Sequence, residues 1–142
     1  MNYVECIGGL KSQRELAESV VNFCISNLMS RFKTLDISVN LNDISKDGAV
    51  GYCMAITSRE FELEIHSKQT PQNLIKTICH EMVHVWQHAT GKLYCDHWYN
   101  IDYTESEYKD RPWEIQAYNL EEPLQKKFIQ SAKKSYFYEK NC

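Results

Sequence analysis

The sequence predicts a domain of the α+β class, with a helix first, a small sheet next and further helices at the C-terminal end. Apolar residues recur at helical spacing over about residues 13–30, alternate with polar residues between about 35 and 65, and return to helical spacing after residue 70. The 142 residues, of which 43% are hydrophobic, are enough for one domain with its own core and too few for two. We therefore expect a single domain over residues 1–142.

The first helix is predicted from about Gln13 to Ser30. It begins after Ser12, which together with Glu15 forms a capping-box pattern that satisfies free backbone amides. Its apolar residues follow at spacings of one to four, as a helix with one buried face requires: Leu16, Val20, Phe23, Cys24 and Leu28.

Three strands are predicted after this helix. The residues from Leu35 to Leu41 alternate between apolar and polar, which indicates a strand with one buried face. The segment Val50–Ile56 is almost continuously apolar or aromatic, so we expect a central strand there, and Phe61–Ile65 alternates again. Because short polar turns connect them, the three strands predict a small and mainly antiparallel sheet.

The strongest helix signal follows the sheet. Thr70 and Pro71 mark its start, with Thr70 as the N-cap and Pro71 at the first helical position, where its missing N–H costs nothing. The pattern continues to about Thr90, and Gly91 ends it.

The remainder of the chain is predicted as a long loop and a helical C-terminal region. Residues 92–111 show no clear periodicity, and a loop of this length in a compact domain usually has a task. A further helix opens at Pro112, is interrupted at Pro123 and continues toward the C-terminus.

Charge and composition narrow the class of protein. Sixteen lysines and arginines against nineteen aspartates and glutamates give a net charge of −3, which disfavours a protein that binds nucleic acid with its whole surface. The longest apolar run is only a few residues, so we expect no membrane-spanning helix and no membrane partner. The six cysteines are scattered without a CxxC pair and the N-terminus has no secretory pattern, so we expect reduced thiols in a cytosol.

The segment from His80 to His84 reads His-Glu-Met-Val-His, the HExxH pattern. On a helix, His80 and His84 lie one turn apart on the face opposite the apolar arc, so both can direct a ring nitrogen at one zinc ion. Glu81 then lies beside the metal without binding it, in the position of a general base for a zinc-bound water. The pattern alone also occurs by chance, but its place in the middle of an amphipathic helix favours metal binding.

A catalytic zinc site needs a third protein ligand and an open position. His88 continues the row along the helix, but three ligands on one straight helix cannot converge on one tetrahedral ion. The metzincin pattern is excluded, because Gln87 and Thr90 stand where it requires glycine and histidine. His97 in the loop and Glu114 on the last helix remain as candidates for the third ligand.

Two paired motifs resemble a known class of enzyme. Residues 74–87 (LIKTICHEMVHVWQ) and residues 110–118 (DRPWEIQAY) look like small phage and bacterial zincin-like metallopeptidases. These proteins combine an HE(M/L)VHVxQ helix with a downstream PWExxA motif, and their broader relatives are the SprT-like and gluzincin-type minimal proteases. The resemblance covers about residues 50–120, and the pair of motifs is far more specific than HExxH alone.

The resemblance implies a minimal zincin-like fold and a zinc-dependent metallopeptidase of the cytoplasm, the host cytoplasm if the protein is phage-encoded. Zn²⁺ would be held by His80, His84 and Glu114, with Glu81 as the base that activates water for peptide-bond hydrolysis. The third predicted strand, at residues 61–65, would form the sheet edge beside the cleft, where it binds an extended protein or peptide substrate.

Two alternatives stay open. SprT and Spartan proteins use a histidine after the motif, which would make His97 the third ligand of a DNA-associated protease. A zincin fold with a structural or vestigial metal would instead be a non-catalytic binding protein for a protein or DNA partner. The basic and aromatic segment at residues 126–138 suits a nucleic-acid contact, whereas the acidic total favours a solvated helix face.

A side chain that polarises the substrate carbonyl is common in such enzymes. Four tyrosines of the long loop are candidates for this role, and each is equally well explained as part of a structural aromatic cluster: Tyr94, Tyr99, Tyr103 and Tyr108.

Overall fold

A computed structural model of the chain describes the backbone of residues 1–141 and the side chains of residues 1–134. The described elements follow the order β1 (Tyr3–Gly8), α1 (Lys11–Leu28), β2 (Asp36–Asn42), β3 (Gly51–Ala55), β4 (Glu60–His66), α2 (Pro71–Ala89), β5 (Leu93–Tyr94), β6 (His97–Trp98), β7 (Ile101–Asp102) and α3 (Pro112–Asn141). Two short 3₁₀ turns are also present, at Ser45–Asp47 and Tyr108–Asp110. The predicted mixture of helices and strands is confirmed.

The main sheet has four strands in the order β1-β2-β4-β3, not the three predicted. Strand β1 was missed, because only Val4 and Cys6 of this short segment pack on the core while its other side chains face solvent. The prediction of a mainly antiparallel sheet is wrong for these strands: β1–β2 and β2–β4 are parallel, and only β3–β4 is antiparallel. The physical reason is that α1 serves as the crossover that a parallel β1–β2 pair requires.

Strands β3 and β4 exchange the places in the sheet that the sequence predicts for them. The predicted central strand Val50–Ile56 corresponds to β3, which is instead an edge strand with Tyr52 44% and Met54 58% exposed. Strand β4, expected at the edge, lies between β2 and β3 and buries Phe61 and Leu63. The apolar run of β3 therefore does not reflect burial on both faces, which is what such a run ordinarily indicates.

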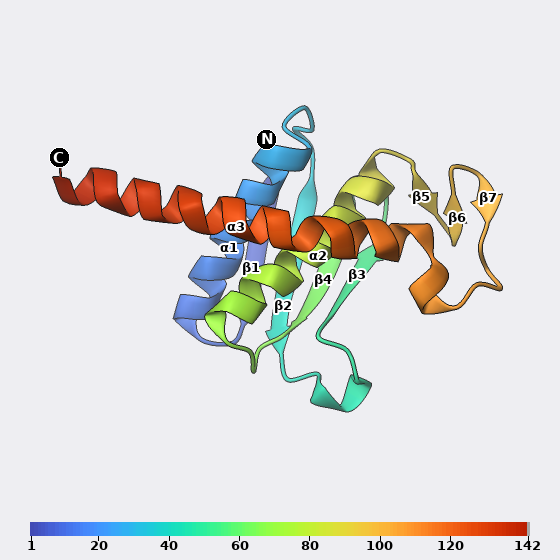
Figure 1. The fold of residues 1–142 in the computed structure, drawn as a ribbon, viewed down its shortest axis with the longest axis horizontal. Coiled ribbons are helices and arrows are strands. Elements are labelled where there is room, and N and C mark those ends of the chain that lie inside the picture. The colour runs from blue at the N-terminus through green and yellow to red at the C-terminus, as the bar shows by residue number, and fades with distance from the viewer. Residues whose placement is uncertain (142) are drawn as a thin grey trace.

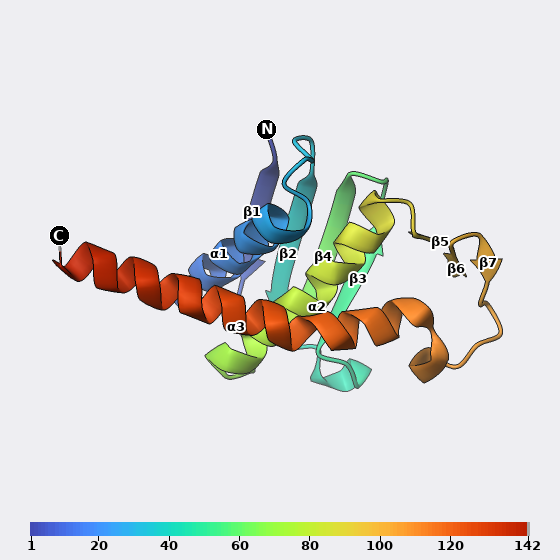
Figure 2. The ribbon, with the colours of Figure 1, turned by 45° about the horizontal axis from the view of Figure 1, so that its top comes forward.

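Helices α1 and α2 pack side by side on one face of the main sheet, and α3 crosses over α2 (Figures 1 and 2). The core between these layers contains apolar side chains from α1, β2, β4, α2 and α3. The C-terminal part of α3 extends past the rest of the molecule (Figure 1). No helix in the described part of the chain has the length and hydrophobicity needed to cross a bilayer.

The ends of α2 lie where the sequence predicts them. The Thr70 hydroxyl accepts a hydrogen bond from the Asn73 amide at 3.2 Å, and Pro71 is the first helical residue. Gly91, with φ of 77°, follows the C-cap residue Thr90. These local signals place the HExxH segment in the middle of a helix.

The ends and interior of the other helices differ in detail. Helix α1 begins at Lys11, because the Gln13 side chain accepts a hydrogen bond from the Leu10 amide at 2.8 Å, and Ser12 is not the cap. Helix α3 is not interrupted at Pro123. The cost of a proline inside a helix, about 3 kcal/mol, is offset where Leu124 and Phe128 bury their side chains directly after it.

The segment between α2 and α3 is more ordered than predicted. It contains a small three-stranded antiparallel sheet in the order β5-β6-β7. Four residues at its tight turns have positive φ: Cys95, Asp96, Tyr99 and Asn100. Positive φ lets very short strands reverse direction, which a periodicity search cannot detect.

Gly8, at the end of β1, and Gly91, after α2, have similar φ angles, and alanine substitutions at the two positions test how closely β1 approaches β2. Replacing Gly8 by alanine places a Cβ 2.3 Å from the Leu41 carbonyl oxygen, whereas Gly91→Ala meets open space. Both have positive φ, so both variants incur roughly 1–2 kcal/mol of backbone strain. We expect Gly8→Ala to lose clearly more unfolding free energy, about 2–4 kcal/mol in a urea titration. Equal losses in the two variants would show that the β1–β2 contact is not this close.

Candidate metal centre

Helix α2 brings the three HExxH residues to one buried site. Its apolar face packs on the sheet and α1, as predicted, and Ile78, Met82 and Val85 are fully buried. The opposite face is also covered, by α3 and β3, so that His80 and His84 are each only 6% exposed. A helix face that the sequence alone would allow to be solvated is therefore the wall of an enclosed site.

Glu114, on the first turn of α3, meets these two histidines. Its Oε1 atom lies 3.1 Å from Nε2 of His80 and 3.1 Å from Nε2 of His84. One ligand atom from each residue lies within 4.8 Å of the other two, and all three residues are buried. The structure thus contains a buried group of His80, His84 and Glu114 that is able to hold a metal ion, assembled from two helices.

The other ring nitrogen of each histidine faces a hydrogen-bond acceptor. His80 Nδ1 lies 3.1 Å from the Glu121 carboxylate, and His84 Nδ1 lies 2.7 Å from the Gln87 side-chain oxygen. The Gln87 amide cannot be flipped, because its Nε2 donates to the Trp113 carbonyl at 3.0 Å. Each Nδ1 is therefore placed to donate to its acceptor, so an Nε2 that carries no second proton presents its lone pair toward Glu114.

This arrangement fits a metal cation. The lone pairs of the two Nε2 atoms and of the Glu114 carboxylate oxygen repel one another at these distances. This repulsion is removed if each ring takes up a second proton or if a cation lies among the three atoms. Two atoms bound at about 2.0–2.1 Å to a tetrahedral zinc ion lie roughly 3.3 Å apart, close to the 3.1 Å separations between Glu114 and the histidines. Nitrogen and carboxylate donors in this number are those of catalytic zinc sites.

The pKa shifts of Glu114 and His84 also favour a cation at this site. Burial by itself raises the pKa of Glu114, but hydrogen bonds to His80, His84 and Tyr108 outweigh it and hold the pKa well below its usual value. Burial lowers the pKa of His84, yet the hydrogen bond to Glu114 and the charge of Glu81 raise it overall. The site therefore favours an anionic Glu114 with positive charge beside it, which a bound metal ion would supply in place of protons.

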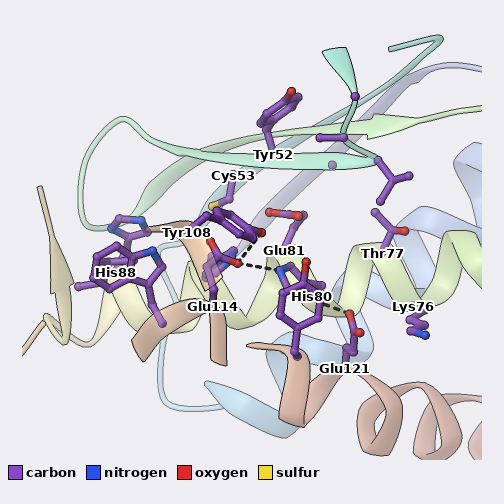
Figure 3. A pocket seen from close by; sticks show the side chains of 18 of the residues that line it. Tyr52, Cys53, Lys76, Thr77, His80, Glu81, His88, Tyr108, Glu114 and Glu121 are labelled. Carbon is purple, nitrogen blue, oxygen red and sulfur yellow. Dashed lines mark hydrogen bonds and ion pairs between the residues drawn. The ribbon is translucent and has the colours of Figure 1, made fainter. Parts of the chain in front are cut away.

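Glu81 lies next to this group but is not part of it. Its carboxyl group is buried, and burial raises its pKa, opposed by the nearby His84 and His80. Figure 3 shows Glu81 between α2 and the strand that carries Cys53. A Cβ at Gly51 of β3 would lie 3.0 Å from Glu81 Oε2, so the absence of a side chain at Gly51 makes room for this carboxylate.

The group opens into a cleft with a volume of about 860 Å³. The cleft runs between β3 on one side and α2 and α3 on the other (Figure 3), and Leu93, Cys95 and Asp96 also line it. His88 lines it and packs against Phe61, as expected for a histidine outside the ligand group. The buried site is thus reached from solvent through a cleft whose volume is within the range of ligand-binding pockets.

Only one of the four candidate tyrosines lies at the site. The Tyr108 hydroxyl donates to Glu114 Oε1 at 2.9 Å and lines the cleft. Tyr103 instead packs edge-on against Trp113, and Tyr99 packs against Trp98. Burial, with hydrogen bonds to Tyr118 and Glu114, raises the pKa of Tyr108, so its phenol stays protonated and acts as a donor.

His97 does not join the two histidines of α2. It lies on β6, where its Nδ1 is 2.9 Å from the Cys95 carbonyl oxygen, and it lines a separate small cavity. Among the described side chains, the group that could hold a metal contains Glu114 as its third member.

Sequence reasoning missed several residues that shape the site. Glu121 and Tyr118 both contact the His80 ring, the latter at 4.6 Å between ring centroids. Their spacings from Glu114, seven residues for Glu121 and four for Tyr118, are the only sequence signal, because residues at such spacings share one face of a helix. Cys53 of β3 is half-buried and also lines the cleft.

The C-terminal basic segment is described only in part. The Lys126, Lys127, Lys133 and Lys134 side chains are exposed, as a solvated helix face requires. The side chains of residues 135–138 lie outside the described part of the chain.

No protein-family model, curated protein or solved structure matches this chain.

Metal analysis of two variants tests which residue is the third ligand. We expect the purified protein to bind one equivalent of zinc, Glu114→Ala to lose most of that affinity, and His97→Ala to keep it, as measured by competition with a chromogenic chelator. Loss of one direct ligand costs far more than the ten- to hundredfold typical of a supporting residue. Retention by Glu114→Ala together with loss by His97→Ala would assign the third ligand to His97.

Proposed function

We propose that this protein is a zinc-dependent peptidase that hydrolyses peptide bonds with Glu81 as general base. The observation that carries the proposal is the buried group of His80, His84 and Glu114, which meets Glu81 at the base of an open cleft. Three protein ligands leave one position of a tetrahedral ion free, as a catalytic rather than a structural zinc site requires.

The bound zinc would supply Lewis acidity, lowering the pKa of a coordinated water and polarising a carbonyl oxygen. His80, His84 and Glu114 would hold it, while Glu121 and Gln87 fix the orientation of the two rings.

Glu81 is the residue suited to proton transfer. Burial raises its pKa, which makes its carboxylate a stronger base than an exposed glutamate. In the proposed reaction Glu81 takes a proton from water, the water oxygen attacks the carbonyl carbon, and the carbon–nitrogen bond breaks. The proton held by Glu81 then passes to the leaving amine.

The position of β3 supports a peptide as substrate. Strand β3 is the edge of the main sheet and pairs with β4 alone, and its residues 51–53 line the cleft. An extended peptide can pair with the free backbone groups of such an edge strand. The strand that would bind substrate is therefore β3, and not the β4 segment that the sequence predicted for this role.

The decisive test replaces the base and leaves the ligands intact. We expect Glu81→Gln to bind zinc with nearly unchanged affinity and to lose activity by a factor of about 10²–10⁴, measured on fluorescent peptides and on a denatured protein. The amide keeps the shape of the carboxylate but cannot accept the proton. A wild-type protein that binds zinc and cleaves none of these substrates would contradict the proposal and favour a non-catalytic binding protein.

Gly51 provides a second test, which acts on Glu81 from across the cleft. In Gly51→Ala the new Cβ would press on the Glu81 and Thr77 side chains, at 3.0 and 2.9 Å. We expect peptide hydrolysis to fall roughly tenfold to a hundredfold, with zinc affinity close to wild type because no ligand is touched. Met54→Ala, on the outer face of the same strand, is the matched control and should keep its activity. Equal activity in both variants would argue against a role for Glu81 in this position.

A further inference from the structure

We infer that Gln87 is a positioning residue that couples the second metal ligand, His84, to the third, Glu114. The inference rests on the proposed metal centre, but it concerns how the chain assembles that centre from two separate helices. Gln87 is 0% exposed, which is rare for an uncharged amide side chain and indicates that its hydrogen bonds are satisfied inside the protein.

Gln87 uses both ends of its amide. On α2, its Oε1 accepts the hydrogen bond from His84 Nδ1 at 2.7 Å. On α3, its Nε2 donates to the Trp113 carbonyl at 3.0 Å and to the Gln116 side-chain oxygen at 2.9 Å. One buried side chain therefore contacts a ligand on α2 and the residues on either side of the ligand on α3.

These bonds restrain both ligands at once. The bond to His84 fixes which ring nitrogen faces the metal position. The bond to the Trp113 carbonyl holds the residue directly before Glu114, in the first turn of α3, where few intrahelical bonds restrain the backbone. Because both restraints pass through one rigid amide plane, a shift of α3 away from α2 would also disturb the His84 ring.

Gln125 offers a matched control. Its Nε2 also donates across the same pair of helices, to the Gln72 carbonyl on α2 at 2.8 Å. This bond lies away from the three ligands and is exposed to solvent. A residue that only helps α2 and α3 to pack would behave like Gln125, whereas a positioning residue would also change the metal site.

The experiment compares zinc affinity in Gln87→Leu, Gln87→Glu and Gln125→Leu, with the fold checked by circular dichroism. We expect zinc affinity to fall ten- to a hundredfold in Gln87→Leu and to stay within about twofold of wild type in Gln125→Leu. Gln87→Glu separates the contact with His84 from the contacts with α3. Its carboxylate still accepts from His84 but cannot donate to the Trp113 carbonyl, so we expect it to lose affinity as well.

Two further measurements do not depend on activity. The visible spectrum of the cobalt-substituted protein should change in both Gln87 variants, because it reports the geometry of the ligands. Without metal, backbone amides of residues 112–118 should exchange with deuterium faster in Gln87→Leu than in Gln125→Leu. If Gln87→Leu does not fold, Gln87→Met, which keeps the length of the side chain, takes its place in every comparison.

The outcomes separate this inference from the proposed function. Unchanged zinc affinity in Gln87→Leu, equal losses in Gln125→Leu, or wild-type affinity in Gln87→Glu would each overturn the coupling role. A wild-type protein that binds zinc but hydrolyses no peptide would overturn the proposed function and leave the role of Gln87 standing. A wild-type protein that binds no zinc would overturn both.

Discussion

The structure depends on one buried oxygen atom, Oε1 of Glu114, at which α2, α3 and the Tyr108–Asp110 turn meet. Two imidazole nitrogens and a phenol converge on it at 2.9–3.1 Å. Two further carboxylates, Glu81 and Glu121, are buried close by. Removing three carboxylates from water in one place is costly unless positive charge compensates them. A divalent cation among the ligands would provide that charge, so the composition of the site itself favours metal binding.

The rest of the fold can be understood as support for this convergence. Helix α2 is covered on both of its faces, by the sheet and α1 on the apolar side and by α3 and β3 on the polar side. Small or uncharged residues stand where the elements approach most closely: Gly51 leaves room for Glu81, and the fully buried Ala117 lies on the turn of α3 after Glu114. Ordered side chains beyond the ligands then fix ring orientation, which is the general requirement for a precise metal site.

The sequence predicts the parts of the site that local rules determine. His80 and His84 share a face because they are four residues apart, and Thr70, Pro71 and Gly91 determine where their helix begins and ends. Pro112 likewise predicts where α3 begins. The choice of Glu114 over His97 as the third ligand came from a resemblance between motifs. The contact of Glu121 with His80 was not predicted, because it depends on how α3 packs against α2, and no local sequence rule determines that packing.

Strand order is decided by contacts between distant segments, and this is where sequence reasoning failed. The alternation in residues 35–65 identifies strands but not their neighbours, since every order buries the same inward side chains. In the structure β1 pairs with one side of β2 and β4 pairs with the other, so β4 lies in the interior and β3 is left at the edge. The position of β3 bears on the site in two ways. Its free backbone edge lies beside the cleft, and its Gly51 lies against Glu81. In the proposed function, β3 would thus hold the backbone edge that binds an extended peptide at a fixed position relative to the buried Glu81 carboxylate.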